Sequence, residues 1–138
     1  MVVPESVIGG SIDRGTILLG RFSNIDHPKF FVVIGVYEDT VAGYFFINSN
    51  INTNVIKGQE QLKLQYVIRP SDYPFLDYDS YICATTIKPY NKKDIVEGVM
   101  KGSVKIKDRL KDEHLNEILG LTRASKLFSP DEKRKYLY

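Results

Sequence analysis

The sequence predicts an α+β protein that is mainly β: a small, partly open barrel followed by C-terminal helices. Two apolar runs, 29–37 and 41–47, are rich in β-branched and aromatic residues, and polar residues separate them, which is typical of a β-hairpin. Both runs are apolar without alternation, which indicates strands that are covered on both faces. Toward the C-terminus the spacing of apolar residues changes to a helical period. These observations place the hairpin at the centre of a small curled sheet with helices packed beside it.

The remaining elements follow from apolar patterns and their boundaries. Residues 1–13 contain Pro4 and two glycines without periodicity, so we expect a flexible arm there. We expect one domain over 1–138, with the barrel in 15–107 and the helical part in 111–138. The further strands are expected at 15–22, 62–69, 80–88 and 103–107. The helices are expected at 92–100, at 111–124 and, from a Ser-Pro-Asp-Glu capping signature, just after Ser129.

Composition favours an ordinary globular protein. Hydrophobic residues make up 43% and charged residues 26% of the chain, which are typical values. No apolar run is long enough to span a membrane, and the first residues do not resemble a signal peptide, so we expect a cytoplasmic protein without membrane contact. The only cysteine, Cys83, excludes an intramolecular disulfide and is expected to be a buried small hydrophobe.

The charge is distributed unevenly along the chain. Residues 1–87 carry a net charge of −3 and residues 88–138 a net charge of +5. A basic C-terminal third suits a nucleic acid or an acidic protein as partner. The signs alternate there, so a solvated helical face explains the pattern equally well. We find no phosphate-binding glycine loop, dinucleotide fingerprint or zinc-type Cys/His spacing, and we expect no cofactor and no metal.

Polar residues at the two ends of the hairpin are the candidates for chemistry. His27 lies in a loop between strands and has a side chain suited to acid–base work; the alternative is an ordinary surface histidine. Three polar residues, Asn48, Ser49 and Asn50, follow the second strand. They could bind phosphate groups or base edges; the alternative is that they only form a turn. Arg21 flanks the first strand and could bind a phosphate group; the alternative is an ordinary surface cation.

Other polar and aromatic residues have a structural interpretation beside a functional one. Tyrosines 66, 73, 78 and 81 lie around Arg69, where they suit stacking on single-stranded bases or closure of a small barrel. His114 lies near the start of the helix at 111–124 and is expected to be solvated.

The order of these segments resembles the MazF/PemK toxin family, the SH3-like barrels of the CcdB/MazF fold group. Resemblance runs over about residues 15–122, as pattern more than identity. It is carried by Gly15 to Phe22, His27-Pro28 with the run 30–34, Phe46-Ile47-Asn48-Ser49, Asp79 to Ile82, and Gly102 with 110–119.

The resemblance implies an activity and partners. It implies metal-independent cleavage of single-stranded RNA, in which the 2′-hydroxyl attacks the adjacent phosphate with the help of a base, a cation and an acid. It also implies a homodimer and an antitoxin protein whose peptide lies in the active groove.

The resemblance also assigns roles to residues. The family's key arginine falls on His27, which would act as acid and base, and its key threonine falls on Asn48, which would hold phosphate together with Ser49. Both replacements depart from the family pattern, because histidine lacks the bidentate fork of arginine and asparagine is a poor acid. The implied substrate-binding residues are Arg21 or Lys29, as the cation, and Asn50.

Two further functions stay open. One is a non-catalytic barrel that binds a protein partner, as a gyrase-poison-like protein or a degenerate toxin relative. In that case His27 and Asn48 are ordinary loop residues and Tyr136-Leu137-Tyr138 is the contact. The other is a structural adaptor without a toxin role.

Overall fold

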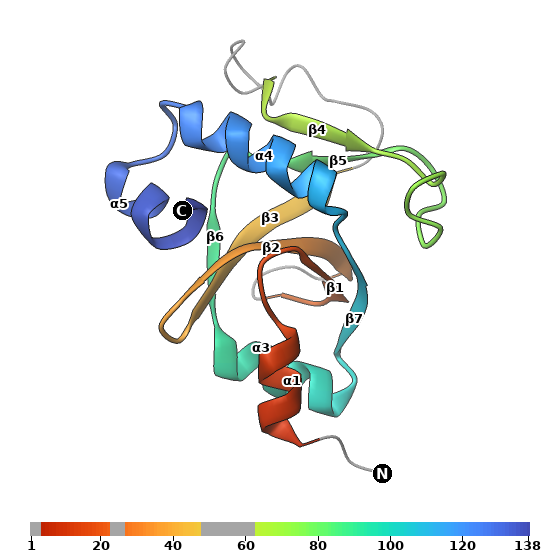
Figure 1. Ribbon diagram of the computed structural model, residues 1–138. Coiled ribbons are helices and arrows are strands. Elements are labelled where there is room, and N and C mark those ends of the chain that lie inside the picture. The colour runs from red at the N-terminus through yellow and green to blue at the C-terminus, as the bar shows by residue number, and fades with distance from the viewer. Residues whose placement is uncertain (1–3, 23–26, 48–62) are drawn as a thin grey trace.

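The computed structural model describes residues 4–22, 27–47 and 63–138 (Figure 1). The strands are β1 Thr16–Gly20, β2 Lys29–Tyr37, β3 Thr40–Ile47, β4 Gln65–Ile68, β5 Ser80–Cys83, β6 Lys88–Asn91 and β7 Val104–Arg109. The helices are α1 Glu5–Ser11, α3 Lys92–Lys101, α4 Asp112–Ala124, the single turn α5 Pro130–Glu132 and the π-helical η1 Lys133–Leu137.

The strands of the described residues form one seven-stranded antiparallel sheet that does not close. Its order is β4-β5-β3-β2-β1-β7, and β6 pairs with β3. The first half of β3 pairs with β6 and its last two residues pair with β5, so β3 bends from one part of the sheet to the other. The predicted α+β, mainly β class is confirmed, and the sheet is not closed, as expected for a partly open barrel.

The central strand β2 is buried on both faces, as its unbroken apolar run predicts. Its side chains alternate between two cores that lie above and below the sheet in Figure 1. The α4 core lies against α4 and consists of Ile17, Val32, Ile34, Ala42, Tyr44, Phe46, Leu64, Ile68, Tyr73, Leu76, Ile82, Ala84, Ile87, Leu110, Leu115, Ile118, Leu119, Phe128 and Leu137. The α3 core lies against α1 and α3 and consists of Ile8, Ile12, Leu18, Phe22, Phe31, Val33, Val41, Ile95, Val96 and Val104.

The hairpin between β2 and β3 is tighter than the polar run 38–40 indicates. Tyr37 pairs with Thr40, which leaves Glu38 and Asp39 as the two-residue turn. Glu38 has a φ of 53°, the left-handed backbone conformation that such turns require.

The N-terminal segment differs from the expectation of a flexible arm. Its residues from Glu5 to Ser11 form α1, and Ile8 is buried against the α3 core. The two glycines weaken helix propensity, so the sequence gives no helical signal, but burial of this apolar residue and of Ile12 stabilises the helix in the folded chain.

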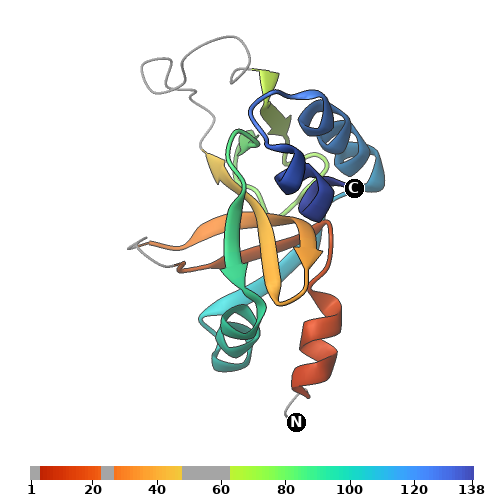
Figure 2. The ribbon, with the colours of Figure 1, turned by 90° about the vertical axis from the view of Figure 1, so that its left-hand side faces the viewer.

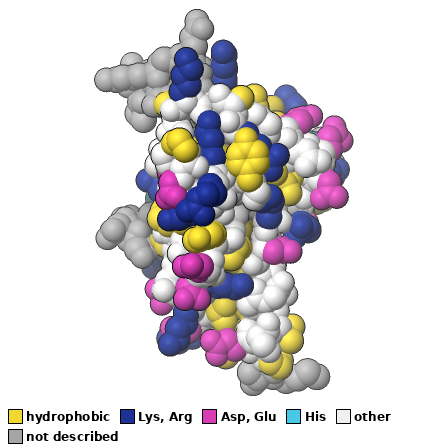
Figure 3. Space-filling view, turned by 60° about the vertical axis from the view of Figure 1, so that its left-hand side comes forward, with side chains coloured by type: hydrophobic (Ala, Val, Ile, Leu, Met, Phe, Trp, Pro, Cys, Tyr) yellow, Lys and Arg dark blue, Asp and Glu magenta, His cyan; other side chains and the backbone are white. Residues whose placement is uncertain are grey.

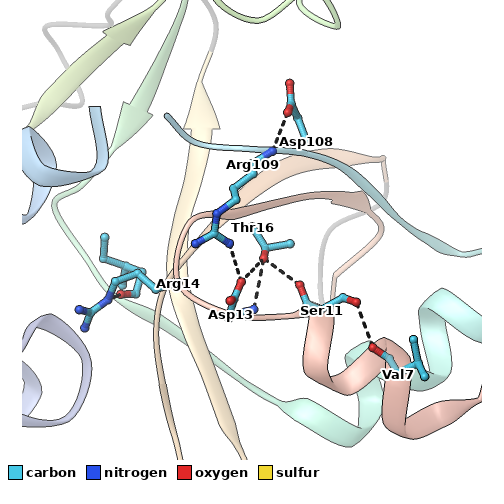
Figure 4. A network of polar contacts seen from close by, with 8 residues as sticks. Val7, Ser11, Asp13, Arg14, Thr16, Asp108 and Arg109 are labelled. Carbon is cyan, nitrogen blue, oxygen red and sulfur yellow. Dashed lines mark hydrogen bonds and ion pairs between the residues drawn. The ribbon is translucent and has the colours of Figure 1, made fainter. Parts of the chain in front are cut away.

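A polar network ties the end of α1 to the outer strand β7 (Figure 4). The Thr16 hydroxyl lies 3.0 Å from both the Ser11 carbonyl and the Asp13 carboxylate. Arg109 of β7 donates to the same carboxylate at 2.6 Å. In Figure 4 the side chain of Arg14 points away from this network. All donors and acceptors here serve local structure, so we assign this network no catalytic role.

The segment expected as one strand over 80–88 is two strands. β5 ends at Cys83 and β6 begins at Lys88, with turn residues between them. The break follows from the bend of β3, because β5 and β6 pair with different halves of that strand. Cys83 is half-buried, not fully buried, and its sulfur lies 3.3 Å from the Gln65 amide nitrogen.

The C-terminal segment 133–138 packs on the body of its own chain. Leu137 is completely buried in the α4 core. Arg14 donates to the carbonyl oxygens of Ile34 at 2.8 Å and Tyr136 at 3.0 Å, which fixes the segment against β2. A Cβ added to Gly35 of β2 would lie 2.3 Å from the Tyr136 oxygen, so the two backbones are in direct contact.

None of the helices in the described ranges combines the length and the apolar content needed to cross a membrane. The expected cytoplasmic location stays a prediction.

Candidate nucleic-acid interface

Four aromatic rings gather on the α3-core side of β2, β3 and β6. Phe22 and Phe31 are buried, whereas Phe45 and Tyr90 are half-buried and present part of their rings to solvent. The Phe31 ring lies 5.1 Å from that of Phe45 and 5.6 Å from that of Tyr90. Strand register explains the grouping, because Phe31 pairs with Phe45 and Val41 pairs with Tyr90.

Gly43 makes room for this arrangement. A Cβ at Gly43 would lie 2.8 Å from a ring carbon of Phe31, so the Phe31 ring lies over the glycine. The buried Phe31 ring in turn supports the exposed edges of its two aromatic neighbours. Such edge-to-face contacts fix ring orientation at little entropic cost.

Two lysines flank the exposed rings. The Lys29 ammonium lies 5.8 Å from the centre of the Phe45 ring, a cation–π contact. Lys88 precedes Tyr90 by two residues in β6, so the two side chains lie on the same face of the strand. The Lys88 side chain is exposed. We call the surface formed by Lys29, Phe45, Lys88 and Tyr90 the aromatic–lysine face.

The aromatic–lysine face carries the two chemistries that single-stranded nucleic acids require. Flat rings stack on bases of any sequence, and ammonium groups pair with backbone phosphates. Burial raises the pKa of the Tyr90 phenol above its ordinary value of 10.0. The hydroxyl is neutral at physiological pH in either case and can donate a hydrogen bond. The face is therefore suited to a flexible polyanion with exposed bases.

Of the six predicted site residues, Lys29 belongs to this face, and Arg21 and His27 lie close to it along the chain. Lys29 pairs with Gly20 at the ends of β2 and β1, which brings the start of β2 next to Arg21, the residue after Gly20. His27 precedes Lys29 by two residues and is exposed, as is Arg21. Within the described ranges, neither of these two side chains makes a hydrogen bond or ion pair.

The other three predicted site residues lie outside the described residues. They are Asn48, Ser49 and Asn50, which follow the last residue of β3. The convergence of His27 with Asn48 therefore stays a prediction. Across the part of the chain that the structure describes, no three His, Cys, Asp or Glu side chains are placed to hold a metal ion together.

The sequence-based interpretation missed Phe45, Lys88 and Tyr90. It placed base stacking instead on the tyrosines around Arg69. Tyr73 among them is buried, and the Tyr66 hydroxyl is bonded to the Glu117 carboxylate. The pairing of Lys88–Asn91 with β3 decides which rings meet, and no local pattern in the sequence reveals that register.

His114 is not simply solvated, as the sequence led us to expect. It is half-buried, and its Nδ1 lies 2.7 Å from the hydroxyl of Tyr73. The same hydroxyl accepts the Lys111 backbone N–H at 2.9 Å. The cluster holds the start of α4 on the loop before β5 and serves the fold.

Tyr73 is one of several tyrosines whose raised pKa limits stability at alkaline pH. Burial raises the pKa of its phenol above the ordinary value of 10.0, although the Lys111 N–H opposes the shift. A group whose pKa is higher in the folded state contributes stability that is complete below the unfolded pKa and is lost as the pH rises through the folded pKa. We therefore expect urea midpoints to fall above about pH 10. The fall should be smaller in Tyr73→Phe than in Tyr78→Phe, which changes an exposed tyrosine; equal falls would contradict the assignment.

Neither the comparison with models of known protein families nor the search of curated proteins gives a match to this chain.

Proposed function

We propose that this protein is a MazF/PemK-like toxin-type protein that binds single-stranded RNA at the aromatic–lysine face. The observation that supports the proposal is the half-exposed pair Phe45 and Tyr90 between Lys29 and Lys88. Stacking on the rings and pairing with the lysines bind RNA with little dependence on base identity. A homodimer and an antitoxin protein belong to the same proposal through the family resemblance.

We further propose that the bound RNA is cleaved without a metal. In this step His27 removes the proton of a 2′-hydroxyl, whose oxygen attacks the adjacent phosphorus. The bond to the 5′-oxygen breaks, and a proton returns to that oxygen, which leaves a cyclic phosphate and a free 5′-hydroxyl. Lys29, which pairs with Gly20, or Arg21, which follows Gly20, would stabilise the charge on the phosphate oxygens. His27 is exposed and precedes Lys29 by two residues, which supports this assignment.

The protein-binding alternative receives less support from the structure. It uses Tyr136-Leu137-Tyr138 as its contact, yet Leu137 is completely buried and the backbone of this segment is held by Arg14. A partner would find only part of the segment accessible.

RNA binding can be measured by fluorescence anisotropy with a labelled, unstructured RNA. We expect Phe45→Ala and Tyr90→Ala each to weaken binding about tenfold, the usual loss for one stacked base. Lys29→Ala should lower the slope of log affinity against log salt concentration by about one, as expected for the loss of one phosphate contact. Matched controls are Tyr78→Ala and Lys105→Ala, which remove an exposed tyrosine and an exposed lysine elsewhere. Equal binding by all variants, or no binding by the unchanged protein, would overturn the proposal.

Cleavage is tested by incubating the same RNA in EDTA with the unchanged protein and with His27→Ala. Cleavage that persists in EDTA and disappears in the variant is the expected result. Cleavage that survives the substitution would remove His27 from the mechanism. Intact RNA in both samples, with binding preserved, would reduce the function to RNA binding alone.

A further inference from the structure

A surface hollow lies beside the C-terminal segment, away from the aromatic–lysine face. It has a volume of about 340 Å³ and is lined by Pro130, Lys133, Arg134 and Tyr138. The hollow is shallow and largely open to solvent, so a ligand would bind at the surface. Figure 3 brings this side of the molecule forward and shows Lys and Arg side chains gathered around hydrophobic ones.

The Tyr138 ring is presented to solvent on a fixed support. The side chain is 71% exposed, which is the largest exposure among the large hydrophobic side chains of the described residues. The Arg123 guanidinium lies 4.8 Å from the ring centre, and Arg123 also donates to the Leu137 carbonyl at 2.5 Å. The backbone oxygen of Tyr138 accepts a further bond from Arg14 at 3.2 Å. The ring is thus a pre-organised wall for a flat partner.

The hollow carries more positive than negative charge. Asp131 is shared by two cations, Arg134 at 2.7 Å and Lys135 at 3.1 Å. Lys133, which lines the hollow, forms no ion pair with the described residues. The guanidinium groups of Arg14 and Arg123 contact the backbone of the same segment, which adds positive charge behind the ring. An anionic group is the natural complement of this surface.

We propose that this hollow binds a nucleotide, with the base stacked on Tyr138 and the phosphate held by Lys133 and Arg134. Apolar walls from Pro130 and the tyrosine ring, together with a cationic rim, fit a ligand that is flat at one end and anionic at the other. This inference does not depend on the proposed RNA function. The hollow belongs to the segment that packs into the α4 core, whereas the aromatic–lysine face lies on the side of the α3 core. In Figure 2 the C-terminus and the start of β2 lie on opposite sides of the molecule.

The test uses adenosine monophosphate, adenosine and inorganic phosphate as probes, followed by NMR chemical shifts of the labelled protein. We expect the monophosphate to bind more tightly than either part alone and to shift the amide signals of Lys133, Arg134 and Tyr138. Tyr138→Ala should weaken its binding about tenfold, whereas Tyr138→Phe should retain it, because the ring is kept. Lys133→Ala should weaken the binding of the monophosphate but leave the binding of adenosine unchanged. Lys105→Ala is the matched lysine control.

The outcomes separate this site from the RNA interface. Loss of monophosphate binding in Tyr138→Ala with unchanged RNA anisotropy supports two independent sites. Shifts confined to Phe45 and Tyr90 would overturn the hollow as a nucleotide site while leaving the RNA proposal intact. Phosphate that binds as well as the nucleotide, or a nucleotide that causes no shifts at all, would also overturn it.

Discussion

Replacing Gly43 by alanine is expected to lower the free energy of unfolding by about 3 kcal/mol, the upper end of the usual effect of overpacking. The added Cβ would lie 1.9 Å from the Val32 carbonyl oxygen, which is a backbone atom of the paired strand β2. It would also lie 2.8 Å from a ring carbon of Phe31. The Val32 oxygen belongs to the backbone and the Phe31 ring is completely buried, so β2 and β3 must separate at this point.

The matched control for this substitution is Gly120→Ala in α4. A Cβ there meets no atom within 4 Å. Alanine is favoured over glycine in a helix interior by about 1 kcal/mol, so this variant should be more stable than the unchanged protein. Urea unfolding followed by circular dichroism measures both changes. A Gly43→Ala variant as stable as the unchanged protein would show that the strands are not packed this closely.

The central hairpin was the part of the fold most accessible from sequence. The strand over 29–37 was predicted with the bounds that the structure gives, because an apolar run rich in Val, Ile and Phe suits a strand buried on both faces. The helix expected at 111–124 corresponds to α4, whose apolar side chains repeat at helical spacing. Both signals are local, and tertiary contacts reinforce them.

The elements that were missed depend on contacts between distant residues. The helix α1 contains two glycines and gains its stability from burying Ile8 in a core formed by later strands. The break between β5 and β6 follows from the bend of β3, which is not encoded within residues 80–91. Local propensity cannot report either of these interactions.

The candidate site was predictable only in part for the same reason. Polar loop residues such as His27 stand out in a sequence because loops often carry function. Phe45 and Tyr90 look like ordinary strand residues, and they become a surface only when β3 lies between β2 and β6. The sequence therefore predicts candidates in loops, such as His27, whereas only the strand register brings the aromatic residues of the candidate site together.

Replacing Leu137 by alanine is expected to cost about 3 kcal/mol of unfolding free energy, because the substitution leaves a cavity in a fully buried position. The matched control is Leu121→Ala in α4, where the leucine side chain is 41% exposed and its loss should change stability by less than about 1 kcal/mol. Urea unfolding separates the two variants. Equal stabilities would show that the C-terminal segment does not contribute to the α4 core in solution.

The Leu137→Ala variant also tests how the nucleotide hollow is built. Lys133, Arg134 and Tyr138 belong to the segment that Leu137 anchors, so loosening the anchor should speed hydrogen exchange over residues 133–138 first. Binding of adenosine monophosphate should then weaken, because the ligand must order the segment before the ring and the cations can act together. RNA binding by Phe45 and Tyr90 should change little, since those rings rest on the α3 core. A variant that loses both kinds of binding equally would mean that the two surfaces are coupled through β2.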